Sequence, residues 1–189
     1  MANDVFIHSY DWDSDISEMS SAAASGLLVS NHSYGTVAGW YWNGSSWSWV
    51  GDQTVSTTED YVFGFYTDKA KYYDEVSYNA PYYLIVKSAG NDRGEGPTNA
   101  NPPIDGGANG FDCIPGDGVA KNILTVGATT DLVNGPSGNP SEVTITSFSS
   151  FGPADDGRVK PDIVGNGYGL YSTSSQGKSI YYSSSGTIW

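Results

Sequence analysis

The chain has 189 residues and one cysteine, Cys113, so it is long enough to bury a hydrophobic core and cannot form an internal disulfide. Its formal net charge of -13 argues against nucleic-acid binding, because the phosphates would be repelled. No apolar run approaches the ~20 residues that span a bilayer, and no basic segment followed by an apolar one opens the chain. We therefore expect a single domain over residues 1–189 with neither membrane contact nor a signal peptide.

The first predicted unit is a short helix followed by a buried strand. Asp15 and Glu18 have the spacing of a helix-capping pair, which predicts a helix over about residues 15–25. The apolar run that follows predicts a strand over residues 27–31, ending in a polar segment closed by Gly35.

His32 lies in that polar segment and is a candidate catalytic base. A histidine without a placed nucleophile and an acidic partner is more often a hydrogen-bonded structural residue. The structural interpretation is therefore preferred for His32 on the sequence alone.

Residues 39–50 are dense in tryptophan and tyrosine, and Asn43-Gly44 interrupts them. That dipeptide between alternating aromatic residues predicts a tight hairpin. Its tryptophans would either pack over the sheet or stack on sugar rings, and packing is the more common use.

The next predicted elements continue the alternation of helix and strand. A helix is expected over residues 61–79, and the apolar run 82–87 then predicts a strand whose two faces are both covered by helices. Residues 92–118 are rich in Gly, Pro, Asn and Asp and are expected to form a surface loop. Further strands are expected over 122–127 and 143–148, followed by a glycine-rich tail. This order predicts an α/β fold with a mostly parallel sheet.

Asn91 follows the strand predicted over residues 82–87, after Gly90. Ligands of open α/β sheets bind beyond the carboxyl ends of the strands, so the Asn91 amide would reach that crevice as a hydrogen-bond donor. The simpler alternative is a turn in which asparagine tolerates an unusual backbone angle.

Several segments together resemble one enzyme family. The most specific are Ser147-Phe148-Ser149-Ser150-Phe151-Gly152-Pro153 and Lys160-Pro161-Asp162-Ile163. With Ala89-Gly90-Asn91 and Ser33-Tyr34-Gly35, they resemble the central and C-terminal part of a subtilisin-like serine peptidase domain, over about residues 20–187.

The resemblance implies a partial subtilisin-like three-layer fold from a secreted parent protein, in which calcium is a possible cofactor. It implies that Asn91 is the oxyanion donor. It also implies that Ser33, Tyr34, Gly35 and Gly90 bind a peptide substrate.

The chain also departs from the family's pattern. The catalytic Asp and the His motif of the family have no counterpart, and Gly186-Thr187 is followed by Ile188 where the nucleophilic serine is expected. Without these groups no proton-accepting route activates a hydroxyl, so we expect no peptidase activity. Because the missing parts would leave the sheet uncovered, we expect a homodimer or higher oligomer.

An alternative function is glycoside hydrolysis by paired carboxylates, with tryptophans as sugar platforms and a polysaccharide as substrate. The candidate acids are Glu59, Asp60, Glu95 and Glu142. Surface acids are common in so acidic a chain, so most of them are expected to be solvated charges.

Overall fold

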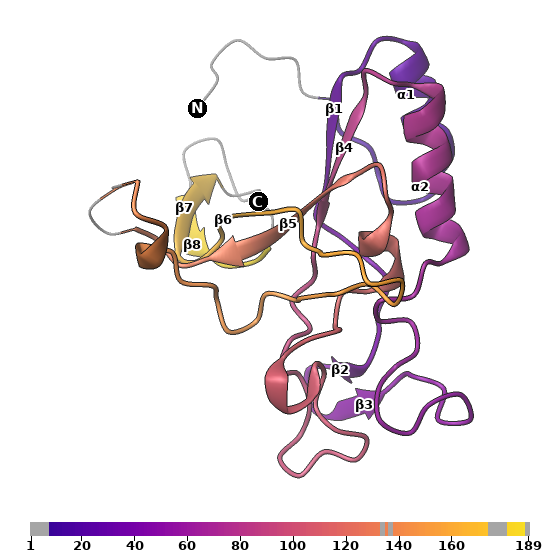
Figure 1. The fold of residues 1–189 in the computed structure, drawn as a ribbon. Coiled ribbons are helices and arrows are strands. Elements are labelled where there is room, and N and C mark those ends of the chain that lie inside the picture. The colour runs from indigo at the N-terminus through magenta and orange to yellow at the C-terminus, as the bar shows by residue number, and fades with distance from the viewer. Residues whose placement is uncertain (1–7, 133–134, 136–137, 174–180, 188–189) are drawn as a thin grey trace.

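The computed structural model describes residues 8–132, 135, 138–173 and 181–187. Its helices and strands alternate in the first half of the chain and are replaced by strands and loops in the second (Figure 1). The elements are α1 (Asp15–Ala24), β1 (Val29–His32), β2 (Trp40–Trp42), β3 (Trp47–Trp49), α2 (Asp68–Asn79), β4 (Leu84–Ser88), β5 (Leu124–Thr129), β6 (Ile163–Asn166), β7 (Leu170–Thr173) and β8 (Tyr181–Ser184). Three short 3-10 helices cover Gly107–Asn109, Gly116–Val119 and Pro140–Glu142.

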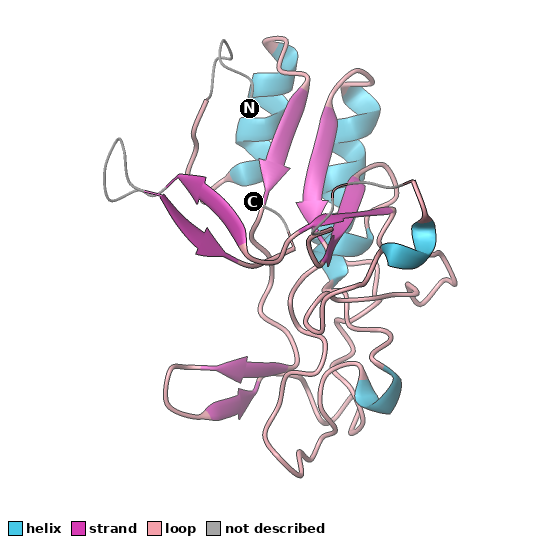
Figure 2. Ribbon diagram, turned by 90° about the vertical axis from the view of Figure 1, so that its left-hand side faces the viewer, coloured by secondary structure: helices cyan, strands magenta, loops and turns pink. Residues whose placement is uncertain are grey.

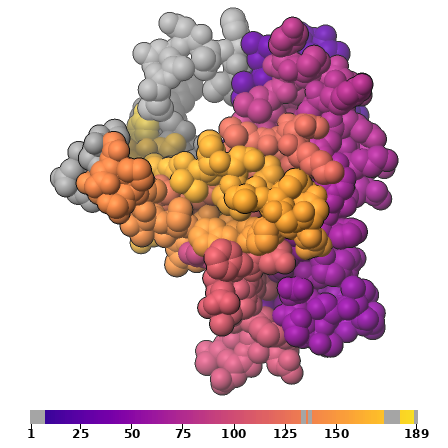
Figure 3. Space-filling view, in the orientation of Figure 1, coloured from indigo at the N-terminus to yellow at the C-terminus, as the bar shows by residue number. Residues whose placement is uncertain are grey.

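The main sheet has four strands in the order β1-β4-β5-β6, and every neighbouring pair is parallel. This confirms the α/β class and the parallel sheet. Helices α1 and α2 lie side by side against the β1 and β4 end of the sheet (Figures 1 and 2). Two antiparallel pairs, β2–β3 and β7–β8, form sheets of their own. The β7–β8 pair lies next to β5 and β6 (Figure 1), whereas the β2–β3 hairpin belongs to the purple lower part of the molecule in Figure 3.

The helices cover one face of the sheet, so the expectation that both faces are covered is wrong for the described residues. On the helix side, Ile85 of β4 and Thr125 of β5 are fully buried. On the opposite side, Leu84 of β4 is 39% exposed and Ile163 of β6 is 49% exposed. The described chain therefore builds two of the three layers implied by the resemblance.

The helix predicted over about residues 15–25 is confirmed as α1, but its capping differs from the prediction, and α2 begins later than predicted. Asp15 and Glu18 form no capping pair, because the residue before α1 is Ser14 in a left-handed conformation without a side-chain cap. Helix α2 begins at Asp68 because the Thr67 hydroxyl accepts a hydrogen bond from the Ala70 N–H. The segment predicted to be helical over residues 61–67 is instead a turn that pairs with the loop before Gly116–Val119.

The strand predicted over residues 143–148 is absent from the described structure, where this segment makes one isolated bridge between Ile145 and Thr129. The strand that follows β5 in the sheet is instead β6, which lies in the stretch predicted to be a glycine-rich tail. The Asp162 N–H donates to the Thr125 carbonyl, and an Asp162 oxygen accepts from the Thr125 N–H, so the two chains are held in register just before β6. The β7–β8 hairpin also was not predicted.

The aromatic hairpin is confirmed. Trp40 pairs with Trp49 and Trp42 with Trp47 across β2 and β3, and the ring centroids of each pair are 5.4 Å apart. The Trp40 indole N–H donates to the carbonyl oxygens of Pro102 and Pro103. Trp40 is therefore a packing residue that ties the hairpin to the long loop.

No helix in the described ranges is long and apolar enough to cross a membrane.

Candidate substrate cleft

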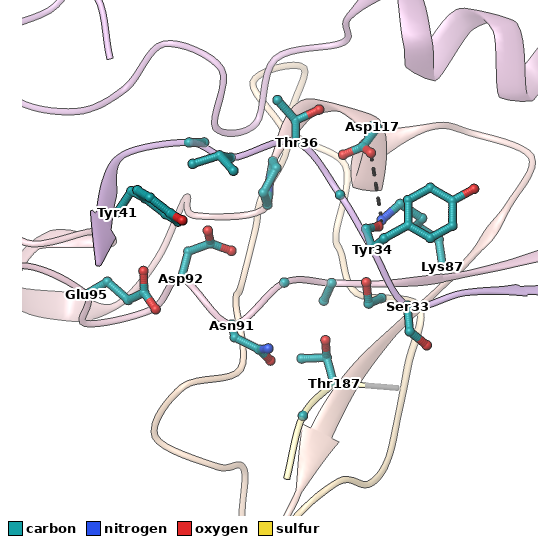
Figure 4. Close-up of a pocket in the computed structure, with 18 of the residues that line it drawn as sticks. Ser33, Tyr34, Thr36, Tyr41, Lys87, Asn91, Asp92, Glu95, Asp117 and Thr187 are labelled. Atoms are coloured by element: carbon teal, nitrogen blue, oxygen red, sulfur yellow. Dashed lines mark hydrogen bonds and ion pairs between the residues drawn. The ribbon is translucent and has the colours of Figure 1, made fainter. Parts of the chain in front are cut away.

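A cavity of about 560 Å³ opens at the carboxyl ends of β1 and β4, and we refer to it as the cleft. Because β1 and β4 are parallel neighbours, the turns that follow them reach the same edge of the sheet. The Gly186-Thr187 segment, which follows β8, closes the cleft from another side (Figure 4). The segments that meet here are Ser33-Tyr34-Gly35, Gly90-Asn91-Asp92 and Gly186-Thr187.

Lys87 holds the backbone of Tyr34, on the β1 side of the cleft, in place. Its ammonium group donates a hydrogen bond to the Tyr34 carbonyl and lies 3.8 Å from an Asp117 carboxylate oxygen (Figure 4). Burial lowers the pKa of Lys87, while the Asp117 charge opposes that shift. A side chain on Gly35 would project toward this ion pair, 3.3 Å from Lys87 Nζ, so the backbone there is close to the buried charges.

Gly90 makes the turn that delivers Asn91. Its φ of +105° is left-handed, and an added Cβ would overlap an Asp92 carboxylate oxygen and lie 3.0 Å from Ser150 Oγ. Ser150 Oγ accepts from the Asp92 N–H and donates to the Asp92 carboxylate, which locks the turn. The Asn91 side chain is exposed and in Figure 4 points into the cleft toward Thr187.

Asp92 is a functional candidate that the sequence reasoning missed. Burial, followed by the nearby Glu95 charge, raises the pKa of Asp92 to about 7. Burial also raises the pKa of Glu95, which lines the cleft as well. The only sequence signal for Asp92 was its place next to Asn91 in the strand-terminal turn.

The four candidate acids of the alternative function lie in different places. Glu95 lines the cleft, whereas Glu59 lines a separate cavity beside the Gly107–Asn109 helix. Asp60 is buried and accepts hydrogen bonds from the N–H groups of Gly39 and Val62. Glu142 is exposed in the 3-10 helix Pro140–Glu142.

The nucleophile position of the resemblance, Ile188, lies outside the described residues, and so does Trp189. Of the described residues that line the cleft, none is a histidine. His32 instead lines a second cavity on the helix side of β1. Within the described ranges, no three His, Cys, Asp or Glu side chains are grouped so that they could hold a metal ion.

Comparison with known proteins places the cleft in a family context. The family model described as Subtilase family matches residues 8–187, which is nearly the whole chain. The chain is also similar to the uncharacterized protein aq_aa18 of Aquifex aeolicus, with 36% identity over 63 residues. That match covers 33% of this chain and 28% of the relative, so the chain spans well under half of that protein. Because the family model covers the fold and all three segments of the cleft, this chain belongs to the subtilase family of serine peptidases.

Proposed function

We propose that the chain binds an extended peptide in the cleft and does not hydrolyse it. The observation that carries this proposal is the convergence of Ser33-Tyr34-Gly35, Asn91 and Gly186-Thr187, far apart in sequence, on one cavity. After β1 the backbone of residues 33–35 lies along the cleft wall, where a peptide strand could pair with it.

The expected lack of hydrolysis rests on the side chains that the cleft offers. The Asn91 amide could donate a hydrogen bond to an oxyanion, but hydrolysis also needs a nucleophile and a base beside that donor. The described lining residues supply no histidine to accept the proton of a hydroxyl. An oxyanion donor alone leaves a small residual acceleration.

A binding assay with a library of fluorescent, end-blocked peptides tests the proposal, with mass spectrometry of the same samples to detect cleavage. We expect saturable binding without cleavage, and Gly35→Val should weaken it by about tenfold or more, because its side chain would crowd the Lys87 ammonium. Gly165→Ala is the matched control, since the added Cβ meets nothing closer than 3.9 Å. Cleavage by the purified chain, or binding that Gly35→Val leaves unchanged, would refute the proposal.

Glycoside hydrolysis is a second candidate, favoured by one observation. Glu95 and Asp92 both line the cleft beside the aromatic side chains of Trp40 and Tyr41. Burial raises the pKa of both carboxyls, and that of Asp92 reaches about 7, as suits the protonated acid of a glycosidase pair. Release of reducing sugar from a polysaccharide panel, lost in Glu95→Gln, would support this function over peptide binding.

We also propose that the chain associates with a second copy through the face of the sheet opposite the helices, which we call the open face. We further propose that its parent protein is secreted. The open face carries the apolar side chains of Leu84 and Ile163, which are 39% and 49% exposed. Strand β1 is an edge strand of the described sheet, so it too offers a surface for association.

A further inference from the structure

A second cavity, of about 380 Å³, lies between α1 and β1, on the helix side of the sheet. Its lining combines serine, histidine, tyrosine and acidic side chains with apolar ones. The polar residues that bear on the argument are Ser30, His32, Tyr34, Tyr83 and Asp15, and the apolar ones include Met19, Ala22 and Leu27. His8, Ser9, Tyr10, Asp11, Glu18 and Asn31 also line the cavity. This set of residues is separate from the machinery of the cleft, except that Tyr34 reaches both cavities.

The strand places the polar residues. Ser30, His32 and Tyr34 are two residues apart along β1 and its extension, so their side chains point to the same side. That side faces α1 and α2, where His32 is only 6% exposed, while Ser30 is half-buried and lines the cavity.

The hydrogen bonds between these residues form one directed chain. Ser30 Oγ lies 2.6 Å from His32 Nε2, and His32 Nδ1 lies 2.7 Å from Tyr34 Oη. The Tyr34 hydroxyl donates to an Asp15 carboxylate oxygen at 3.2 Å. Because the Tyr34 proton goes to Asp15, Tyr34 Oη accepts from Nδ1–H, and Nε2 is left with a lone pair for the Ser30 hydroxyl.

The far end of the chain is itself held in place. The same Asp15 oxygen accepts from the Tyr73 hydroxyl at 3.2 Å and lies 3.4 Å from the Lys69 ammonium. On the other side, the Tyr83 hydroxyl donates to Ser30 Oγ at 2.6 Å. The structure thus places a nucleophile, Ser30, beside a base, His32, and links that base through Tyr34 to an acid, Asp15. The sequence alone gave no evidence of such partners for His32.

We propose that Ser30 is a nucleophile activated by His32, and that this second cavity cleaves esters with a short apolar acyl group. Ser30 Oγ attacks the ester carbonyl carbon while its proton moves to His32 Nε2. The C–O bond to the alcohol then breaks, and the alcohol leaves with the proton from Nε2. Water, deprotonated by His32, releases the acid and restores the Ser30 hydroxyl.

The other members have supporting roles in this proposal. Tyr34 and Asp15 are positioning residues: they hold the tautomer and the ring of His32 and take no part in making or breaking bonds. Tyr83 donates to Ser30 Oγ, and in this proposal its hydroxyl turns to the carbonyl oxygen as negative charge develops there. The side chains of Met19 and Leu27 give the acyl group an apolar wall.

The direct test uses the unaltered chain. We would incubate it with an alkyl fluorophosphonate probe, which transfers its phosphonyl group to an activated serine and releases fluoride, and then locate the adduct by peptide mass spectrometry. We expect one adduct, on Ser30, and turnover of 4-nitrophenyl butyrate that the probe blocks. No adduct, or an adduct on another residue, would overturn the proposal, whatever the outcome of the peptide-binding assay.

Variants separate catalysis from structure. Ser30→Ala and His32→Gln should each lower the rate of ester cleavage by at least about 100-fold. Ser48→Ala, an exposed strand serine in the β2–β3 hairpin, is the matched control and should leave the rate unchanged. Tyr34→Phe should slow cleavage less than His32→Gln and shift the pH at which the rate rises, which a purely structural role would not do.

Discussion

Lys87 Nζ lies 3.8 Å from Asp117 Oδ2, and the two side chains are only 2% and 1% exposed. A buried charge without a partner is costly, so each of the two charges stabilises the fold chiefly by compensating the burial of the other. The Lys87 ammonium also donates to the Tyr34 carbonyl, which joins the pair to the wall of the cleft.

Lys87→Met should therefore lower the free energy of unfolding by about 3 kcal/mol, because the buried Asp117 carboxylate then keeps only the partly exposed Lys69 ammonium, 3.9 Å away, as a charged partner. Urea unfolding monitored by tryptophan fluorescence measures this loss. Lys71→Met is the control, because Lys71 pairs with Glu75 on the exposed surface of α2 and should cost less than about 1 kcal/mol. Equal losses in the two variants would contradict the assignment of a buried pair.

Stability should fall as the pH rises from about 4 to about 7. The pKa of Asp92 is raised to about 7 in the folded chain, mainly by burial, against about 3.9 in an unfolded one. The folded state therefore binds more protons across this range, so its advantage is complete below pH 4 and is lost as the pH passes 7. Asp105, whose pKa burial raises to about 8, extends the fall to higher pH.

Urea midpoints measured from pH 4 to pH 8.5 check this expectation, with Asp92→Asn expected to flatten the slope. Asp52→Asn, at a fully exposed position, should leave the slope between pH 5 and pH 8 unchanged. The lowered pKa of His32, about 4, opposes this fall below pH 6.5, so a net rise in the stability of the unaltered chain would mean that Asp92 and Asp105 do not hold their protons in the fold.

Gly90→Ala should destabilise the chain more than Gly26→Ala, although both glycines have left-handed φ angles, of +105° and +96°. At Gly26 an added Cβ meets nothing within 4 Å, so only the backbone cost of about 1 kcal/mol remains. At Gly90 the same Cβ would overlap the Asp92 carboxylate. Thermal unfolding of both variants measures the difference, and peptide binding should be lost only in Gly90→Ala.

The rate of fluorophosphonate labelling should rise with pH around an apparent pKa of about 4 and stay level near neutrality. His32 must be neutral to accept the Ser30 proton, and burial, followed by the Lys87 charge, lowers its pKa to about 4. Asp15 opposes this shift and Lys69 reinforces it. A profile that breaks near the ordinary histidine value of about 6.5 would mean that His32 is not the base.

Light scattering coupled to size-exclusion chromatography should show a dimer or larger species at micromolar concentration. The charge substitutions Leu84→Lys and Ile163→Lys, on the open face of the sheet, should each shift the mass toward 20.1 kDa. Val159→Lys is the control, because Val159 is 83% exposed and lies outside the sheet. A monomer at every concentration would exclude association through this face.

The sequence by itself determined the local pattern. Apolar runs separated by amphipathic segments predicted strands β1, β4 and β5 in a parallel sheet, since that pattern depends on nearby residues alone. The Asn43-Gly44 turn fixed the pairing of the tryptophans in the same way. The peptidase-like segments also identified the family, because each segment is a continuous stretch of residues that can be recognised without the fold.

Only the tertiary structure decided which distant residues meet. Strand β6 forms because Asp162 bonds to Thr125, a contact that no local pattern in the glycine-rich tail could reveal. Lys87 lies in an apolar run that predicted a strand, and its buried partner Asp117 comes from the 3-10 helix Gly116–Val119, which lies in the stretch predicted to be a surface loop. His32 had no visible partner in the sequence, because Ser30 becomes its neighbour only when β1 is extended and Asp15 only when α1 packs on the sheet. Local propensity acts over a few residues, whereas these pairs are set by chain packing over tens of residues.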